Sequence, residues 1–336
     1  MINFSTLQGL TIPEGVVTQI AKDGVVLWAL SGGDIILEVE KITSDTYAGE
    51  TTYTGEEFIL LDIYPKTNGT VNITYGGLTK TITDTSGAEE PNAQQVFFGT
   101  FNGVSDSVAT PYSGTLTIEG DCRGFGVGAF EADSKAILKS YYGGITTINN
   151  WGNIEIIPDY AFSNSVKLTS VEIPNGITNI GAGTFNACSV LESVEIPNSV
   201  TSIGDMAFSY TASLVSIELP NNVRNIGGSA FQGTSLESIE IPNSVTSIGD
   251  MAFSTGTSGA EGTQTLKSVK MLPTTPPNLE GYEDTDGSTL WRNFGELNSE
   301  FSVSVLEEII VPKGCGNSYK AATGWSTYAD YIVEAS

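Results

Sequence analysis

Histidine is absent from all 336 residues, and its absence removes much of enzyme chemistry. Histidine is the usual general base near neutral pH, the partner of Ser and Cys nucleophiles, and a common metal ligand. Only three cysteines occur, Cys122, Cys188 and Cys315, too few for a disulfide framework or a Cys-x-x-Cys zinc site. We therefore expect small buried cysteines, no catalytic residue, no metal and no cofactor, and the chain is predicted not to be an enzyme.

Basic residues are also scarce, since 14 Lys and Arg face 39 Asp and Glu, for a formal charge of −25. A surface this acidic repels phosphate groups, which argues against nucleic acids and anionic membranes as partners. No apolar run of about 18 residues is present, so membrane insertion is not expected. The first residues, from Met1 to Ser5, lack the basic and apolar regions of a secretion signal.

One phrase returns at a fixed period in the C-terminal half. Pro174, Pro197, Pro220 and Pro242 follow one another at steps of 23, 23 and 22 residues. Five phenylalanines keep the same step: Phe162, Phe185, Phe208, Phe231 and Phe253. Repeats of this length predict a solenoid, in which each unit buries its apolar side against its neighbours.

Each unit reads L-x-x-V/I-x-I/L-P, then V/I-x-x-I-G, then A/T-F. The alternation in the first phrase predicts a short strand with one buried side, and the proline ends the strand. The glycine suits a tight corner, and the phenylalanine points inward. We expect the phenylalanines to form a column in the core of the solenoid.

These phrases, such as VEIPNSVTSIGDMAF, resemble the BspA-like, Treponema-type leucine-rich repeats of bacterial surface proteins. The resemblance covers about residues 135–336. The C-terminal phrases LKSVKMLPTTPPNL and IIVPKGCGNSYKAATGWSTYADYIVE are similar to the closing segment of that family. This similarity implies a last strand and a short helix, with Tyr319, Trp325 and Tyr328 capping the exposed core.

The N-terminal half predicts β-structure of another kind. Asp23 and Gly24 join two apolar runs, which is a hairpin signal, and Ser31 to Gly33 read as a linker. Residues 34–118 alternate runs rich in Thr, Val, Ile and Tyr with turn residues. The prediction is a small β-sandwich of immunoglobulin-like architecture.

Two N-terminal phrases also resemble bacteriophage and prophage proteins. The segment holding IPEG, VTQI and Trp28 is similar to small modules of phage structural proteins. GLTKTIT followed by VFFGTFNGVSD is similar to domains of phage-encoded gut proteins. The resemblance implies that residues 1–31 dock to a virus particle.

The predicted fold class is therefore mainly β: an N-terminal hairpin and a sandwich, followed by a leucine-rich-repeat solenoid with a cap. The predicted divisions are a docking segment at 1–31, the sandwich at 32–120, the solenoid at 121–270, and an insertion with the cap at 271–336.

One column of acidic residues is predicted on the repeat strands: Glu172, Glu195, Glu218 and Glu240. Strands about 4.8 Å apart place these carboxylates close enough to repel by roughly 1 kcal/mol per pair in water. The column is either a binding site for a basic partner or cations, or a solvated edge copied by repeat duplication.

Four further candidate site residues lie in the insertion near residues 280–306. Asp284 and Asp286 are oxygen ligands of the kind that calcium takes, but the EF-hand pattern fails at Tyr282 and Asn293. Trp291 and Phe294 either stack on sugars and anchor a partner, or fold the insertion onto the solenoid. Paired carboxylates for glycoside hydrolysis have no specific support.

The function predicted from these features is non-catalytic binding or adhesion. The main hypothesis is a virion protein that joins other virion proteins through residues 1–31. Its repeats then bind a bacterial surface glycan or protein. The alternative is a BspA-like adhesin or host-interaction protein, located on the bacterial cell surface or secreted. A homo-oligomer is compatible with either hypothesis.

Overall fold

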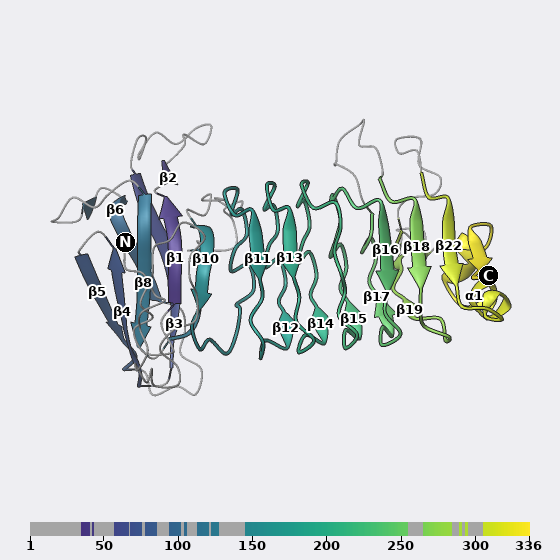
Figure 1. Ribbon diagram of the computed structural model, residues 1–336, viewed down its shortest axis with the longest axis horizontal. Helices are drawn as coiled ribbons and strands as arrows, with labels where there is room; N and C mark the ends of the chain where they lie inside the picture. Colours follow the sequence, from purple (N-terminus) through teal and green to yellow (C-terminus); the bar gives the residue numbers. More distant parts are fainter. Residues whose placement is uncertain are drawn as a thin grey trace, which may run out of the picture.

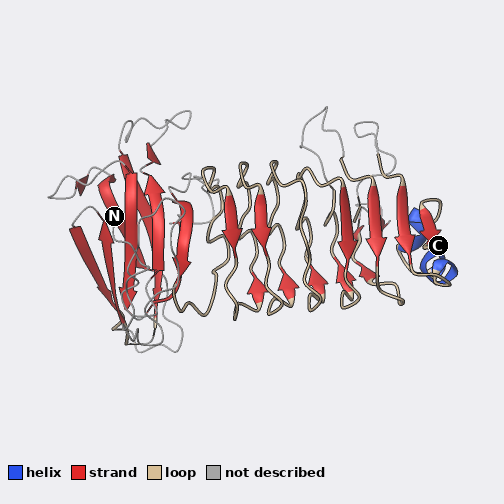
Figure 2. Ribbon diagram, viewed as in Figure 1, coloured by secondary structure: helices blue, strands red, loops and turns tan. Residues whose placement is uncertain are grey.

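The structure is a computed structural model, and it describes part of the chain in detail. The described residues are 35–40, 42–43, 57–66, 68–75, 78–85, 94–101, 104–105, 113–120, 122–127, 145–254, 265–283, 289–290, 293–294 and 305–336. They are mainly β, as the sequence predicted. Antiparallel strands form one end, and a stack of short strands leads to the C-terminus (Figures 1 and 2). The predicted hairpin in residues 1–31 lies outside the described residues.

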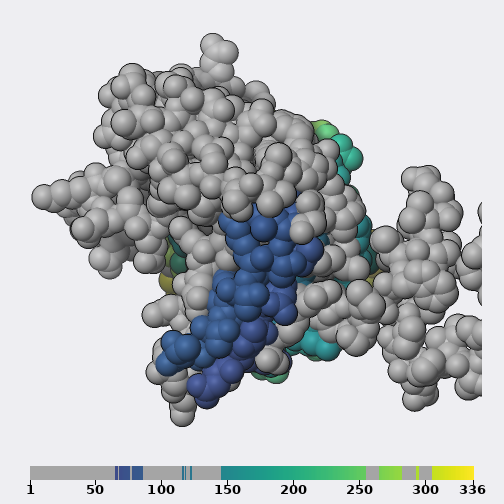
Figure 3. All heavy atoms as spheres, turned by 90° about the vertical axis from the view of Figure 1, so that its left-hand side faces the viewer, coloured from purple at the N-terminus to yellow at the C-terminus, as the bar shows by residue number. Residues whose placement is uncertain are grey.

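Two antiparallel sheets form the N-terminal part. The first has the order β10-β1-β8-β4-β5, and the second the order β2-β3-β6-β7, with β9 also paired to β3. The N-terminal strands are β1 (Ile35–Glu40), β2 (Ile42–Thr43), β3 (Glu57–Pro65), β4 (Thr70–Tyr75), β5 (Leu78–Thr83), β6 (Gln94–Phe101), β7 (Val104–Ser105), β8 (Ser113–Gly120) and β9 (Cys122–Val127). Figure 3 looks onto this end, where β4 and β5 lie at the surface. The immunoglobulin-like arrangement stays a prediction.

The core side of the first sheet follows the alternation in its sequence. Val71, Ile73 and Tyr75 on β4 are buried, as are Leu116 and Ile118 on β8. The predicted start of the solenoid at residue 121 falls just before β9, which belongs to the N-terminal sheets because it pairs with β3. The described coils of the solenoid follow β10 (Ile145–Trp151).

Each repeat forms one coil of the solenoid and contributes to two parallel sheets. The first solenoid sheet contains β11 (Ser170–Glu172) and β13 (Ser193–Glu195), then β16 (Ser238–Ile241), β18 (Ser268–Met271), β22 (Glu308–Val311) and β23 (Ile332–Glu334). The second contains β12 (Asn179–Ile180), β14 (Ser202–Ile203), β15 (Asn225–Ile226), β17 (Ser247–Ile248) and β19 (Asn278–Leu279). The first sheet is in two pieces, because residues 215–219 of the third coil form no strand, although the repeat pattern predicts one there.

The phenylalanines stack into a ladder along the solenoid axis. Rings of neighbouring coils, from Phe162 to Phe253, have centroids 5.2 to 5.5 Å apart and planes within 12° of parallel. Trp151 packs edge-on against Phe162 at the N-terminal end of the ladder. All five phenylalanines are fully buried, which confirms that the column belongs to the core.

Backbone hydrogen bonds between coils accompany this ladder. Phe162, Phe185, Phe208 and Phe231 each donate an N–H to a carbonyl of the next coil, at 2.8 to 2.9 Å. Two aspartates add side-chain bonds of the same kind: Asp159 accepts the N–H of Ala182, and Asp205 that of Gly228. The backbone of each coil is therefore held by its neighbours as well as by its own turns.

The repeated glycine is needed because adjacent coils come very close together. At Gly204 a Cβ atom would lie 2.8 Å from the backbone of Gly181, and at Gly227 it would lie 2.6 Å from the backbone of Gly204. The N–H of Gly227 donates to the Ile203 carbonyl at 2.8 Å. A side chain at this position would force the coils apart.

Left-handed backbone occurs at a different position of the repeat. Tyr160, Gly183, Met206, Ser229 and Met251 occupy equivalent places and have φ between 54° and 57°. Residues other than glycine are strained in this region, so each of these non-glycine turns carries a local energetic cost. The repeat pattern did not predict these turns.

Coils continue beyond residue 271, where the sequence predicted an insertion and a cap. β22 extends the first sheet by pairing with β18, and Phe294 stacks on Phe253 with a centroid distance of 5.9 Å. The insertion therefore supplies another rung of the ladder. Asn293 supports it by donating its side-chain N–H groups to the carbonyls of Ile248 and Gly249.

Aromatic residues close the C-terminal end, as predicted. Tyr319 of α1 (Gly316–Ala321) and Trp325 and Tyr328 of the 3-10 helix η3 (Trp325–Tyr328) are fully buried. The Trp325 indole donates to the Pro277 carbonyl and the Tyr319 hydroxyl to the Pro273 carbonyl, each at 2.7 Å. The cap thus covers the last rung, and these two buried donors are paired.

Two of the three cysteines are buried, as the sequence predicted, and Cys315 is half-buried. Cys188 donates its thiol to the Phe162 carbonyl at 3.0 Å. Burial raises the pKa of the Cys188 thiol to about 12. This cysteine therefore stays a protonated hydrogen-bond donor inside the stack.

Replacing Gly227 by Ala should lower the free energy of unfolding by roughly 1–3 kcal/mol, because the methyl group has no room against the preceding coil. The matched control is Gly228→Ala, whose Cβ would lie 3.5 Å from the Asp250 carbonyl oxygen and 3.7 Å from Asp205 Oδ1, both ordinary contacts. Urea unfolding followed by circular dichroism measures both. Equal midpoints for the two variants would contradict the close-approach explanation.

Replacing Phe294 by Ala should cost about 3–5 kcal/mol of stability, since it removes a buried ring between Phe253 and the cap. The control is Val215→Ala, because Val215 is 60% exposed. Thermal and urea unfolding report the difference. A Phe294 variant as stable as the Val215 variant would show that the insertion does not complete the ladder.

Candidate binding surface

The predicted acidic column lies on the outer side of the first solenoid sheet. Glu172, Glu195, Glu218 and Glu240 are all exposed. Glu172 stands beside Glu195 in the register of β11 and β13. We call the exposed side chains of this sheet and of residues 215–219 the strand face. The column runs along it, one carboxylate in each of four successive coils.

The column ends at a lysine that sequence analysis missed. Lys270 on β18 stands beside Glu240 and forms a 2.7 Å ion pair with it. Between the same two coils, Lys267 pairs with Glu237 at 3.2 Å. The signal was available, because LKSVKML places Lys where LESIEIP has Glu. Exposed pairs of this kind contribute little stability, but they neutralise the carboxylates they hold.

The charge of the strand face is therefore uneven along the solenoid. Glu237 and Glu240 have lysine partners, whereas Glu172, Glu192, Glu195 and Glu218 have none among the described residues. Glu172 and Glu195 belong to β11 and β13, the strands of the solenoid that lie nearest the N-terminal sheets (Figure 1). These carboxylates give that end of the strand face a negative charge.

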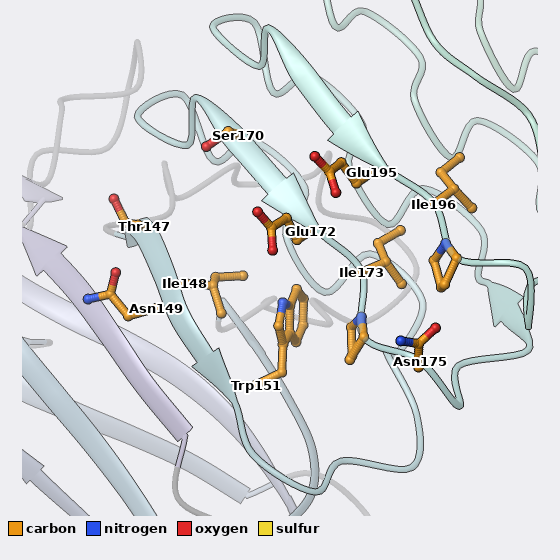
Figure 4. A pocket seen from close by; sticks show the side chains of 12 residues that line it. Thr147, Ile148, Asn149, Trp151, Ser170, Glu172, Ile173, Asn175, Glu195 and Ile196 are labelled. Atoms are coloured by element: carbon orange, nitrogen blue, oxygen red, sulfur yellow. The ribbon is translucent and has the colours of Figure 1, made fainter. Parts of the chain in front are cut away.

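A groove lies at this same end of the strand face, between β10 and β11. Its volume is about 590 Å³. Described residues that line it come from β10 and from the first two described coils: Thr147, Ile148, Asn149, Trp151, Ser170, Glu172, Ile173, Pro174, Asn175, Glu195, Ile196 and Pro197. Figure 4 shows Ile148 and Trp151 between the two strands, with Glu172 and Glu195 on the neighbouring strands. We call it the β10–β11 groove.

The groove follows from the position of β10 between two sheets. Thr147 precedes Ser170 by 23 residues, so β10 occupies the place of a repeat strand in the coil before β11. However, β10 pairs antiparallel with β1 of the N-terminal sheet, and among the described strands β11 pairs with β13 alone. The two strands are neighbours without a ladder between them, and the groove is the space that results.

The other predicted site residues do not gather at this groove. Phe294 is fully buried in the ladder, so the hypothesis that it contacts a partner at the surface is wrong for this residue. Its alternative role, folding the insertion onto the solenoid, is the one observed. Asp284, Asp286 and Trp291 lie outside the described residues. In the sequence, the two aspartates fall between β20 (Tyr282–Glu283) and β21 (Thr289–Leu290), and Trp291 follows β21.

Two other kinds of site are not found among the described residues. No three Asp, Glu or Cys side chains there lie close enough together to hold a metal ion. No helix among them has the length and apolar character to cross a bilayer. The β10–β11 groove and the adjoining carboxylates form the candidate surface in this part of the chain.

Comparisons with known proteins concern mainly the repeats. No curated protein matches the chain. A leucine-rich repeat protein of Treponema pallidum is 30% identical over 38% of this chain and 56% of its own, with a TM-score of 0.32. The pneumococcal vaccine antigen PcpA is 20% identical over 54% of this chain and 38% of its own, with a TM-score of 0.37. A Bacteroides ovatus leucine-rich repeat protein is 21% identical over 64% and 71%, with a TM-score of 0.33.

The chain spans only 56% of the length of the Treponema pallidum structure and 38% of the length of PcpA. The family model for the BspA type leucine rich repeat region matches residues 139–258, in six copies. The match covers the coils that carry the phenylalanine ladder and the acidic column. Residues 139–258 of this chain are a BspA-type leucine-rich repeat region.

Proposed function

We propose that this chain is a non-catalytic binding protein of a bacterial surface, and that its strand face contacts the partner. The observation that carries the proposal is the regular display of exposed side chains on strands held in register with one another. Val171 and Val194 are buried beneath the sheet, while Glu172 and Glu195 stand outward in register. A rigid scaffold with an ordered outer face suits recognition, because little conformational entropy is lost on binding.

Binding fits this surface better than catalysis does. The chain has no histidine, and the candidate carboxylates stand side by side on an open strand surface. Glycoside hydrolysis requires two carboxyl groups on opposite sides of a bond, one of them with a raised pKa. Neighbouring glutamates on successive coils face the same way, so they do not provide that arrangement.

The repeat type favours the bacterial surface over the virion. The BspA-type match covers the coils that carry the strand face, and the resemblance drawn from the sequence associates such repeats with bacterial surface proteins. The virion hypothesis depends on residues 1–31, which lie outside the described residues, and on short N-terminal phrases. Docking to virion proteins, a glycan ligand and homo-oligomerisation stay predictions.

The test of location uses antibodies against the chain and intact cells of the source bacterium. Labelled cells that lose the label after brief external protease treatment are the expected result. Mass spectrometry of purified phage particles from the same culture is the counter-test. The chain at stoichiometric abundance in particles, with unlabelled cells, would contradict the proposal.

The test of the contact surface uses soluble chain as a competitor of bacterial adhesion. Excess soluble chain should reduce attachment of cells that display the protein, since both compete for one partner. Ser193→Tyr, an exposed change on the strand face, should abolish competition. The matched Asn179→Tyr change on the exposed side of the second solenoid sheet should leave it intact. Equal competition by the two variants would place the contact elsewhere.

A further inference from the structure

We propose that the β10–β11 groove binds an extended basic segment of a partner protein, with a lysine or arginine side chain held by Glu172 and Glu195. The proposal rests on the binding function above and adds the location and the chemistry of the partner. Three features of the groove support it: its charge, its apolar floor and the free edge of β11.

The charge of the groove favours binding of a cation. Glu172 and Glu195 are register neighbours on β11 and β13, at the strand spacing of about 4.8 Å. Both line the groove, and the described residues that line it include no Lys or Arg. A cation between the two carboxylates replaces their mutual repulsion by two attractions.

Further along the strand face, two carboxylates already have a cation from within the chain. Lys270 holds Glu240, and Lys267 holds Glu237. These pairs show that exposed carboxylates of this sheet accept a lysine two to three coils away from the groove. Within the acidic column, Glu172, Glu195 and Glu218 have no lysine partner among the described residues, and the first two line the groove.

The floor of the groove suits the stem of a long basic side chain. Ile148, Trp151 and Ile173 are apolar residues that line it, and Ile148 is the most exposed of the three. Figure 4 shows the Trp151 indole close to Ile148, on the β10 side of Glu172. Lysine and arginine bury their methylene stems on apolar surface while the charged head stays outside. The volume of about 590 Å³ is in the range of small-ligand sites, roughly 300–1,000 Å³.

The edge of β11 suits a partner in extended conformation. The Ile173 N–H donates toward β13, to the Glu195 carbonyl at 2.9 Å. Because backbone groups alternate along a strand, the N–H groups of Ser170 and Glu172 point the other way, toward the groove. β10 forms no ladder with them. A partner segment running along the groove can form backbone hydrogen bonds with this edge, in the manner of strand addition to a sheet.

The direct test measures binding of a fluorescein-labelled heptapeptide of alternating Lys and Thr to the full chain by fluorescence anisotropy. The control probe is the same peptide with every lysine acetylated. We expect the lysine peptide to bind and the acetylated peptide to bind at least about tenfold more weakly, a difference equivalent to about 1.4 kcal/mol. Failure of the lysine peptide to bind, or equal binding of the two, overturns the proposal.

Two double variants locate the site. Glu172→Gln with Glu195→Gln should weaken the lysine peptide about tenfold, whereas Glu237→Gln with Glu240→Gln should change its affinity less than about twofold. All four positions are exposed, so both variants should retain the unfolding midpoint of the parent chain. Equal weakening by the two variants indicates diffuse attraction to an acidic surface and overturns the assignment of the groove.

The outcomes also separate this proposal from the general binding function. If Ser193→Tyr loses competition but the Glu172 and Glu195 double variant keeps it, the groove is overturned as the binding site and the strand face remains the contact. Groove-dependent peptide binding with normal competition by Ser193→Tyr supports the groove and overturns the wider contact surface. Two results would identify a different occupant and overturn the proposal. One is that a second copy of the chain displaces the lysine peptide. The other is that the chain binds neutral oligosaccharides and that the groove variant does not.

Discussion

The stacking of each coil on the next is the interaction on which the rest of the structure depends. No coil buries its own apolar side, so the phenylalanine rings, the isoleucines of the second sheet and the backbone hydrogen bonds are all shared between neighbours. Glycine at the Ile-Gly corner allows the approach, as at Gly227 against Gly204. Regular stacking also fixes the positions of outward side chains, which makes the strand face an ordered surface.

Sequence periodicity predicted the features that repeat, because identical contacts demand identical residues. The buried Phe208 and Val194 and the exposed Glu195 were predicted in this way. The capping Trp325 was implied by the resemblance of the C-terminal phrases to a closing segment. Features that depend on a single exception were missed. Lys270 is a single exception to the glutamate of the other copies, and Phe294 follows an insertion that breaks the spacing of the other rungs.

Two further points lay beyond the sequence for physical reasons. The Ile-Gly glycine suggested a tight corner, but close approach of the preceding backbone is what excludes a side chain at Gly204. Pairing of β10 with β1 joins segments more than one hundred residues apart in sequence, and no local pattern specifies that choice. The acidic column was visible in the sequence, but the groove beside it depends on where β10 goes.

The candidate site is thus a consequence of the boundary between two kinds of sheet. An antiparallel sheet takes β10, and the parallel stack begins again at β11. Amide hydrogen exchange at residue resolution tests this break most directly. The account predicts that the amides of Ser170 and Glu172 exchange much faster than those of Ile173 and Glu192, which donate across to neighbouring coils. Equal protection of all four amides would mean that β10 and β11 form a continuous ladder, and would contradict the groove and the function assigned to it.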